Sequence, residues 1–201
     1  REGLDKETML MVDVGAIWGN KIEKALSRSE ILKEANITWL EEPFYSDAFY
    51  EYSQLAKKSS LPLAGGESCH SVESAKNMMR YGGVSFIQID AGIVGGILAG
   101  KEICDYAENN NIQYVNHTFT SHLQLSSSIQ PYAGSIKSTL AEYPMQLKSL
   151  AWDLTKNHIL VNDRGEIELP NKVGHGMEIN LDSLRKYKVD VNIQIDKKRI
   201  F

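Results

Sequence analysis

Short apolar runs alternate with longer amphipathic stretches along the first 142 residues of this chain of 201. The runs have the length and composition of strands, and the stretches between them carry the 3.6-residue period of helices. The predicted strands cover residues 8–14, 37–41, 61–66, 84–90, 112–117 and 138–142. The predicted helices cover residues 21–35, 47–58, 72–81, 97–109 and 121–134, the last interrupted by Pro131. Regular alternation of this kind favours an α/β fold with a parallel sheet.

Each predicted strand ends at a side chain that can act as an acid or a base. These residues are Asp13, Glu41, Glu67, Asp90, His117 and Glu142. Subtracting their numbers gives steps of 28, 26, 23, 27 and 25 residues, enough for a strand, a helix and two loops. In a parallel β/α barrel the C-terminal strand ends meet on one face, where active sites lie. The pattern therefore predicts six units of a (β/α) TIM-type barrel with one catalytic face.

The pattern changes after residue 150. The elements predicted there are a hairpin over 158–169, a short helix over 181–187 and a strand over 188–195. We therefore expect a partial barrel over residues 1–150 and a C-terminal segment over residues 151–201. The sequence opens at Arg1, close to its first strand, as though cut from something longer. A closed barrel of this type has eight units, so two are expected to be missing on the N-terminal side.

Three carboxylates come from consecutive strand ends, at Asp13, Glu41 and Glu67. A set of oxygen ligands without cysteine or histidine favours a hard cation such as Mg²⁺, which keeps positions open for water or substrate oxygens. The alternative is that these acids are loop residues or helix caps on the surface. Their apolar surroundings favour the metal site, because acids next to strand interiors are costly unless they are paired or bound.

Asp90 and His117 end the next two predicted strands. A carboxylate on one imidazole nitrogen fixes the tautomer and raises the basicity of the ring, which suits a general base near neutral pH. The alternative is a structural histidine bonded to a neighbouring carboxylate. Glu142 could bind a substrate carboxylate or act as an acid, or it could lie on the surface. Together the six residues suggest enolisation of a carboxylate substrate beside a dication.

Composition narrows the possible partners and compartment. The formal net charge is −4 and no extended basic patch occurs, so nothing favours nucleic acid as a partner. No apolar run approaches about 18 residues, so no membrane span is expected. Two cysteines, with no visible signal peptide, favour a reducing compartment and a cytoplasmic location.

The motifs around the six residues together resemble those of the enolase superfamily. They are MVD (11–13), WLEEP (39–43), GGE (65–67), QID (88–90), NH (116–117) and AEYP (141–144). The His/Asp pair is similar to that of the mandelate racemase subgroup, within the mandelate racemase/muconate lactonizing enzyme-like proteins, which includes acid-sugar dehydratases. The resemblance covers nearly the whole chain and implies the C-terminal part of a modified (β/α)7β or (β/α)8 barrel.

The resemblance also implies a role for each strand-end residue. Mg²⁺ would be bound by Asp13, Glu41 and Glu67. His117 would be the base, Asp90 would orient its ring, and Glu142 would face the carboxylate of a small sugar-acid substrate. In the pair Glu41-Glu42, the first residue matches the ligand position of the family.

Two parts of the family pattern are not in this sequence: the Lys-x-Lys motif upstream of the first metal ligand, and the N-terminal α+β capping domain. Racemisation needs an acid–base group on each face of the substrate, whereas dehydration can run on the His117 side. We therefore expect an acid-sugar dehydratase, with a racemase or epimerase of a 2-hydroxy acid or related carboxylate as the alternative. A third hypothesis is an inactive truncated fragment. Open sheet edges favour a homo-oligomer, and residues 151–201 are expected to pack toward the capping-domain region.

Overall fold

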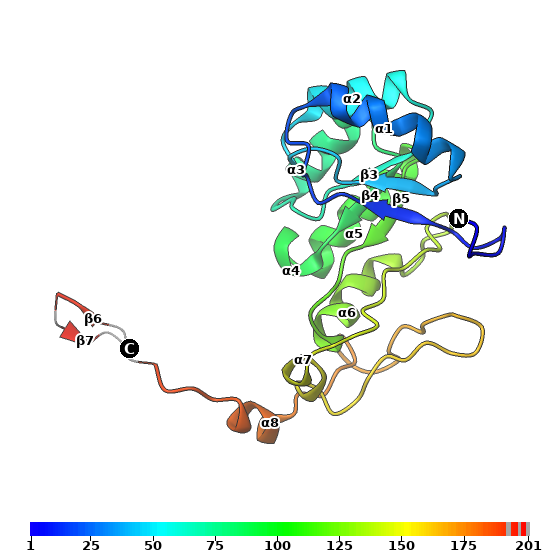
Figure 1. Cartoon of the computed structure of the whole chain (residues 1–201). Helices are drawn as coiled ribbons and strands as arrows, with labels where there is room; N and C mark the ends of the chain where they lie inside the picture. The colour runs from blue at the N-terminus through cyan, green and yellow to red at the C-terminus, as the bar shows by residue number, and fades with distance from the viewer. Residues whose placement is uncertain (192–193, 197, 200–201) are drawn as a thin grey trace.

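The computed structural model describes residues 1–191, 194–196 and 198–199. Five strands form one parallel sheet whose spatial order follows the chain order (Figure 1). The strands are β1 (Met11–Asp13), β2 (Trp39–Glu41), β3 (Leu63–Gly65), β4 (Phe86–Ile89) and β5 (Gln113–Asn116). Each lies inside a predicted strand and is shorter than it. The predicted α/β fold with a parallel sheet is confirmed.

Helices follow each strand of the sheet, and all of them except one short helix directly after β4 lie within the predicted helices. They are α1 (Ile22–Glu34), α2 (Phe49–Lys58), α3 (Val72–Asn77), α4 (Ala91–Val94), α5 (Ile97–Asn109) and α6 (His122–Ile129). A π-helical turn, η1 (Met78–Gly82), continues α3, and a 3₁₀ turn, η2 (Gln130–Tyr132), continues α6. Ser71 caps α3 through reciprocal hydrogen bonds with Ser74. Pro131 ends the regular α-helix because it has no backbone N–H to donate.

Alternation along the strands divides the buried side chains into two layers. One layer packs against the helices and includes Leu40, Leu63, Ile87 and Tyr114 from the sheet. The opposite face carries Trp39, Ala64, Phe86 and Val115, with Met11 and Leu140 packed against them. The rings of Trp39 and Phe86 lie 4.8 Å apart, centre to centre. Burial of each large apolar side chain stabilises the fold by about 1.5–3 kcal/mol, so both faces contribute to the core.

The predicted strand over 138–142 is wrong, because these residues form no ladder with β5. The segment still lies beside β5, and the Asn116 side chain joins the two. Its Nδ2 donates to the Glu142 carbonyl at 3.0 Å, and its Oδ1 accepts from the Glu142 N–H at 3.0 Å. Tyr132 Oη donates to the Leu140 carbonyl at 2.5 Å. Side chains thus replace the backbone pairing of a sixth strand, and Glu142 remains next to the end of β5.

The tail contains less regular structure than its sequence pattern predicts. It holds α7 (Ser149–Asp153), α8 (Leu181–Lys186) and a small antiparallel pair, β6 (Gln194–Ile195) with β7 (Lys198–Arg199) (Figure 1). In place of the predicted hairpin over 158–169 the structure has only a turn. The Asn162 N–H donates a hydrogen bond to the Glu166 carbonyl at 2.9 Å and closes it. Of the predicted strand over 188–195, residues 188–191 are not a strand and 192–193 lie outside the described residues.

The tail is anchored on α6 by aromatic rings. The Ile159 N–H donates to Nδ1 of His122 at 3.2 Å, and His122 is fully buried. The Trp152 and His158 rings stack at 3.8 Å beside it. The proposed division at residue 150, with the tail packing toward a capping domain, stays a prediction. No helix in the described part of the chain is long and apolar enough to cross a membrane.

Candidate active site

Strand register brings the first two acids together. Asp13 pairs with Glu41 across β1 and β2, so the two residues lie side by side at the C-terminal end of the sheet. Asp13 is exposed, and its Oδ1 accepts the Gly15 N–H at 2.8 Å. Glu41 is half-buried, and its Oε2 accepts the indole N–H of Trp39 at 2.9 Å. The Trp39 ring packs in the core and also holds one oxygen of this carboxylate.

Glu67 reaches the same face because the chain leaves β3 through a glycine. Gly66 has φ +120°, and a Cβ there would lie 2.6 Å from Ile87 Cδ1 and 2.9 Å from the Gln88 carbonyl. Only glycine fits this conformation and this close approach to β4. The following residue, Glu67, lies with Oε2 3.4 Å from Nε2 of His117. The structure therefore brings the third predicted ligand against the predicted base.

His117 and Asp90 form a buried pair. His117 Nδ1 lies 3.2 Å from Asp90 Oδ2, and the two residues are 8% and 2% exposed. Asp90 Oδ1 also accepts the Gly92 N–H at 2.7 Å. Burial opposes ionisation of Asp90, but hydrogen bonds from His117, Gln124 and Gly92 outweigh it and lower the Asp90 pKa. The carboxylate is thus held in its charged form beside the ring.

The electrostatic surroundings of His117 favour its charged form. Burial opposes protonation, but the hydrogen bond to Asp90 and the charges of Glu67 and Glu142 outweigh it and raise the His117 pKa to about 9. With Nδ1 on Asp90, Nε2 is the nitrogen that faces the carboxylate-rich side. The imidazole therefore has one nitrogen for orientation and one for chemistry.

Glu142 faces this space from the segment that replaces a sixth strand. Its Oε2 accepts the Thr118 N–H at 2.9 Å. Burial raises the pKa of Glu142, and the charges of Glu41 and Glu67 add to that effect. Its carboxylate is therefore part of the same electrostatic cluster as the two predicted ligands.

Glu42 is a further member that the sequence analysis did not assign. Its backbone has φ +40°, an uncommon value for a residue other than glycine. Burial, with the charges of Glu67, Asp13 and Glu41, raises its pKa to about 7. Its position directly after Glu41 in WLEEP is the only sequence signal. Burial and the charge of Glu42 raise the pKa of Tyr52, a residue of the helix-side core, so Glu42 lies within range of both that core and the acids.

The acids fit a hard cation by chemistry. Burial raises the pKa of Glu67, and the charges of Glu41 and Asp13 raise it further, so the carboxylates repel one another. Oxygen donors that crowd together at strand ends suit Mg²⁺, whose charge would relieve this repulsion. In the described conformation, however, no group of three or more His, Cys, Asp or Glu side chains converges closely enough to hold a metal ion. The carboxylate oxygens are thus suitable ligands for Mg²⁺, but the side chains would have to move closer together to bind it.

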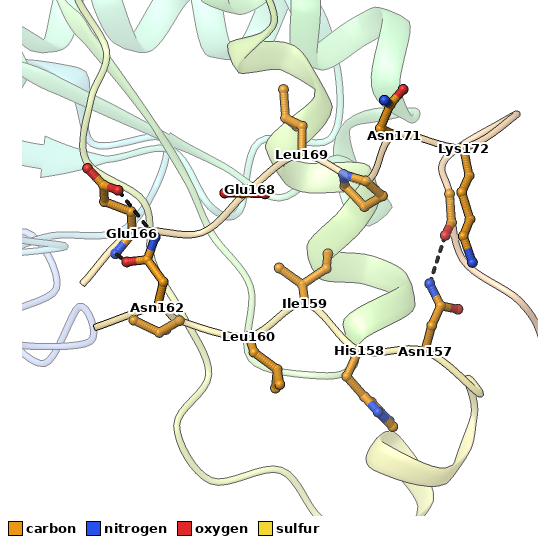
Figure 2. A pocket seen from close by; sticks show the side chains of 13 residues that line it. Asn157, His158, Ile159, Leu160, Asn162, Glu166, Glu168, Leu169, Asn171 and Lys172 are labelled. Atoms are coloured by element: carbon orange, nitrogen blue, oxygen red, sulfur yellow. Dashed lines mark hydrogen bonds between the residues drawn. The ribbon is translucent and has the colours of Figure 1, made fainter. Parts of the chain in front are cut away.

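A hollow of about 450 Å³ lies between the residues that follow His117 and the start of the tail. It is lined by Phe119, Thr120, Ser121, Gln146, Lys148, Leu150, Ala151 and Leu154. The Phe119 ring centre lies 5.2 Å from that of His117. A second hollow, of about 520 Å³, lies between two arms of the tail and is lined by residues such as Asn157, Ile159 and Lys172 (Figure 2). None of the six predicted site residues lines either hollow.

Comparison with known proteins now identifies the family. The sequence model described as "Enolase C-terminal domain-like" matches residues 1–183. The chain belongs to this family. The resemblance inferred from the six motifs is thereby confirmed.

The curated relatives of this chain include a cycloisomerase and a dehydratase. D-Galactarolactone cycloisomerase of Agrobacterium fabrum is 24% identical over 197 residues, covering 94% of this chain and 51% of its own. D-Galactonate dehydratase of Verminephrobacter eiseniae is 26% identical over 194 residues, covering 88% of this chain and 51% of its own. The chain thus spans about half the length of these relatives.

Solved structures agree on the fold. A predicted mandelate racemase from Rhodobacter sphaeroides superposes with a TM-score of 0.91 at 42% identity, over 100% of this chain and 51% of that one. A racemase from Streptomyces coelicolor A3(2), solved with bound magnesium, superposes with a TM-score of 0.80 at 23% identity, over 94% and 49%. The parallel sheet therefore corresponds to the C-terminal barrel half of enolase-family enzymes.

Proposed function

We propose that this chain carries the catalytic face of a Mg²⁺-dependent acid-sugar dehydratase. The observation that carries the proposal is the position of His117, with Nδ1 on Asp90 and Nε2 facing Glu67. One nitrogen is fixed by a buried carboxylate, and the other faces the side where the acids gather. Relatives named as a dehydratase and a cycloisomerase of sugar acids support this substrate class.

Asp13, Glu41 and Glu67 would hold the cation, because they are oxygen donors on neighbouring strand ends. The racemase of Streptomyces coelicolor, which has the same fold, was solved with bound magnesium. When bound, Mg²⁺ would neutralise charge that develops on the substrate carboxylate and would lower the His117 pKa from the metal-free value of about 9 toward neutrality.

His117 would act twice in dehydration. Nε2 takes the proton from the carbon next to the substrate carboxylate, and the electron pair of that C–H bond forms a double bond to the neighbouring carbon. The hydroxyl on that neighbouring carbon leaves with its C–O electron pair, and the imidazolium returns the proton to it, so that water departs. The resulting enol becomes a 2-keto acid. Asp90 stabilises the imidazolium between the two transfers, and Glu142, whose pKa is raised by burial, would face the substrate carboxylate.

A racemase or epimerase is the second candidate. The 42% identity to a predicted mandelate racemase favours it. Such a reaction needs a second acid–base group on the opposite face of the substrate, in addition to His117. The homo-oligomer and the cytoplasmic location expected from the sequence are part of this proposal in either case.

Proton exchange in D₂O distinguishes the candidates. The chain would be incubated with Mg²⁺ and a panel of sugar acids, and deuterium at the carbon next to the carboxylate and 2-keto acid would both be measured. A dehydratase gives the 2-keto acid, whereas a racemase gives deuterium without it. His117→Asn should lose both signals, while His70→Asn, at an exposed histidine near Glu67, should keep them. Absence of both signals with the parent across the panel would contradict activity of this chain.

A further inference from the structure

Gln124, to which the sequence analysis assigned no role, contacts the pair formed by Asp90 and His117. It lies in the first turn of α6, and its Nε2 lies 2.6 Å from Oδ1 and 2.5 Å from Oδ2 of Asp90. The amide therefore spans both oxygens of the carboxylate that orients His117. Asp90 is 2% exposed, so it has little access to water as an alternative donor.

Hydrogen bonds hold both the backbone and the side chain of Gln124. Its backbone N–H donates to Oγ of Ser121, the residue that caps α6, at 3.3 Å. Thr120 Oγ1 donates to Gln124 Oε1, which turns Nε2 of the amide toward Asp90. With one end of the amide on a hydroxyl and the other on a carboxylate, a flip of the group would lose both contacts.

Gly92 leaves room for this contact. A Cβ at position 92 would lie 3.1 Å from Asp90 Oδ1 and 3.4 Å from Gln124 Nε2. The backbone N–H of Gly92 also donates to Oδ1 at 2.7 Å. Asp90 therefore receives donors from Gly92, Gln124 and His117, and these fix the rotation of its carboxylate about the Cβ–Cγ bond.

The chemistry of the amide matters as well as its position. Gln124 is neutral, so it orients Asp90 without cancelling the negative charge that stabilises an imidazolium. A lysine in its place would form an ion pair with Asp90 and weaken the influence of that charge on His117. A residue without a donor would leave Gly92 and His117 as the remaining donors to the carboxylate and would hold it less firmly against Nδ1.

We propose that Gln124 is a positioning residue that holds Asp90 so that Oδ2 faces Nδ1 of His117. The effect on catalysis rests on the proposed function of His117, whereas the effect on geometry does not. The proposal predicts that loss of the Gln124 donor loosens the hydrogen bond between His117 and Asp90 without unfolding α6.

The Nδ1 proton of His117 reports this hydrogen bond directly. An imidazole N–H on a carboxylate gives a low-field proton resonance in NMR spectra, and His117→Asn would assign it in the full chain. Gln124→Met keeps the length of the side chain and removes its donor. In this variant the resonance should move upfield or disappear through exchange with water. The control is Ser127→Ala, on the same helix, which removes a hydroxyl that donates to the Leu123 carbonyl at 3.3 Å.

Two milder variants address the possibility that Gln124→Met fails to fold. Thr120→Val removes the hydroxyl that holds the amide, and Gly92→Ala crowds the contact from the opposite side. Both should move the same resonance in the same direction by a smaller amount. An unchanged resonance in folded Gln124→Met, or in both milder variants, would overturn the proposal. The signal needs no turnover, so an inactive chain with a shifted resonance would refute the proposed function and leave the positioning role standing.

Discussion

Replacing Glu42 with glutamine should stabilise the chain at alkaline pH when divalent cations are absent. The Glu42 pKa is raised from 4.5 to about 7, first by burial and then by the charges of Glu67, Asp13 and Glu41. The folded state therefore holds this proton more tightly than the unfolded state. Stability is lost as the pH rises from about 4.5 through about 7, and it does not return above that range.

The size of the effect follows from the shift. The difference of 7 − 4.5 = 2.5 units corresponds to about 3 kcal/mol at about 1.4 kcal/mol per unit. This is an upper value, because the half-buried carboxylate can relax toward water. Glutamine keeps the shape of the side chain and has no charge to bury. The gain from Glu42→Gln should therefore be largest near pH 8 and small near pH 5.

Urea denaturation in EDTA at these two pH values measures the difference in unfolding free energy. Glu23→Gln, at an exposed glutamate on α1, is the matched control and should leave stability nearly unchanged. Saturating Mg²⁺ should shrink the gain from Glu42→Gln, since a bound cation would relieve the same repulsion. A variant no more stable than the parent at pH 8, or equally stabilised at both pH values, would refute the reasoning.

Two further predictions concern the tail and the exit from β3. Burial and the nearby His158 lower the His122 pKa, so acidification below about 6.5 should destabilise the anchoring of the tail. His122→Gln should be less stable than the parent at pH 7.5, since the Ile159 N–H loses its ring acceptor. The difference in urea midpoint between variant and parent should become smaller at pH 5.5. An equal difference at both pH values would contradict a lowered His122 pKa. Gly66→Ala should cost about 1–3 kcal/mol of strain, with further loss from contact with Ile87; a urea midpoint equal to that of the parent would contradict the geometry.

The strand-end positions could be predicted from the sequence because they depend on local patterns. Apolar runs of limited length, separated by helical periods, place Asp13, Glu41, Glu67, Asp90 and His117 at one end of a parallel sheet whatever the details of packing. The five strands and their connecting helices follow from the same patterns. Family resemblance then adds chemistry that spacing alone leaves open.

Features that depend on contacts distant in sequence could not be predicted in this way. Residues 138–142 have a strand-like pattern, but the Asn116 side chain takes the hydrogen bonds of the missing ladder. Gln124 acts on a carboxylate 34 residues away. Glu42 adopts a positive φ, which no hydrophobic pattern encodes. In each case a side-chain contact or a single dihedral angle decides the outcome.

Titration with Mg²⁺ by calorimetry tests most directly whether the acids at the strand ends form a cation site. The measurement compares the parent with Glu67→Gln, and Glu23→Gln serves as the control. Saturable binding to the parent and the control, lost in Glu67→Gln, is the predicted result. Folded parent protein that takes up no Mg²⁺, or a Glu67→Gln variant that binds as well as the parent, would contradict a cation site built on Asp13, Glu41 and Glu67.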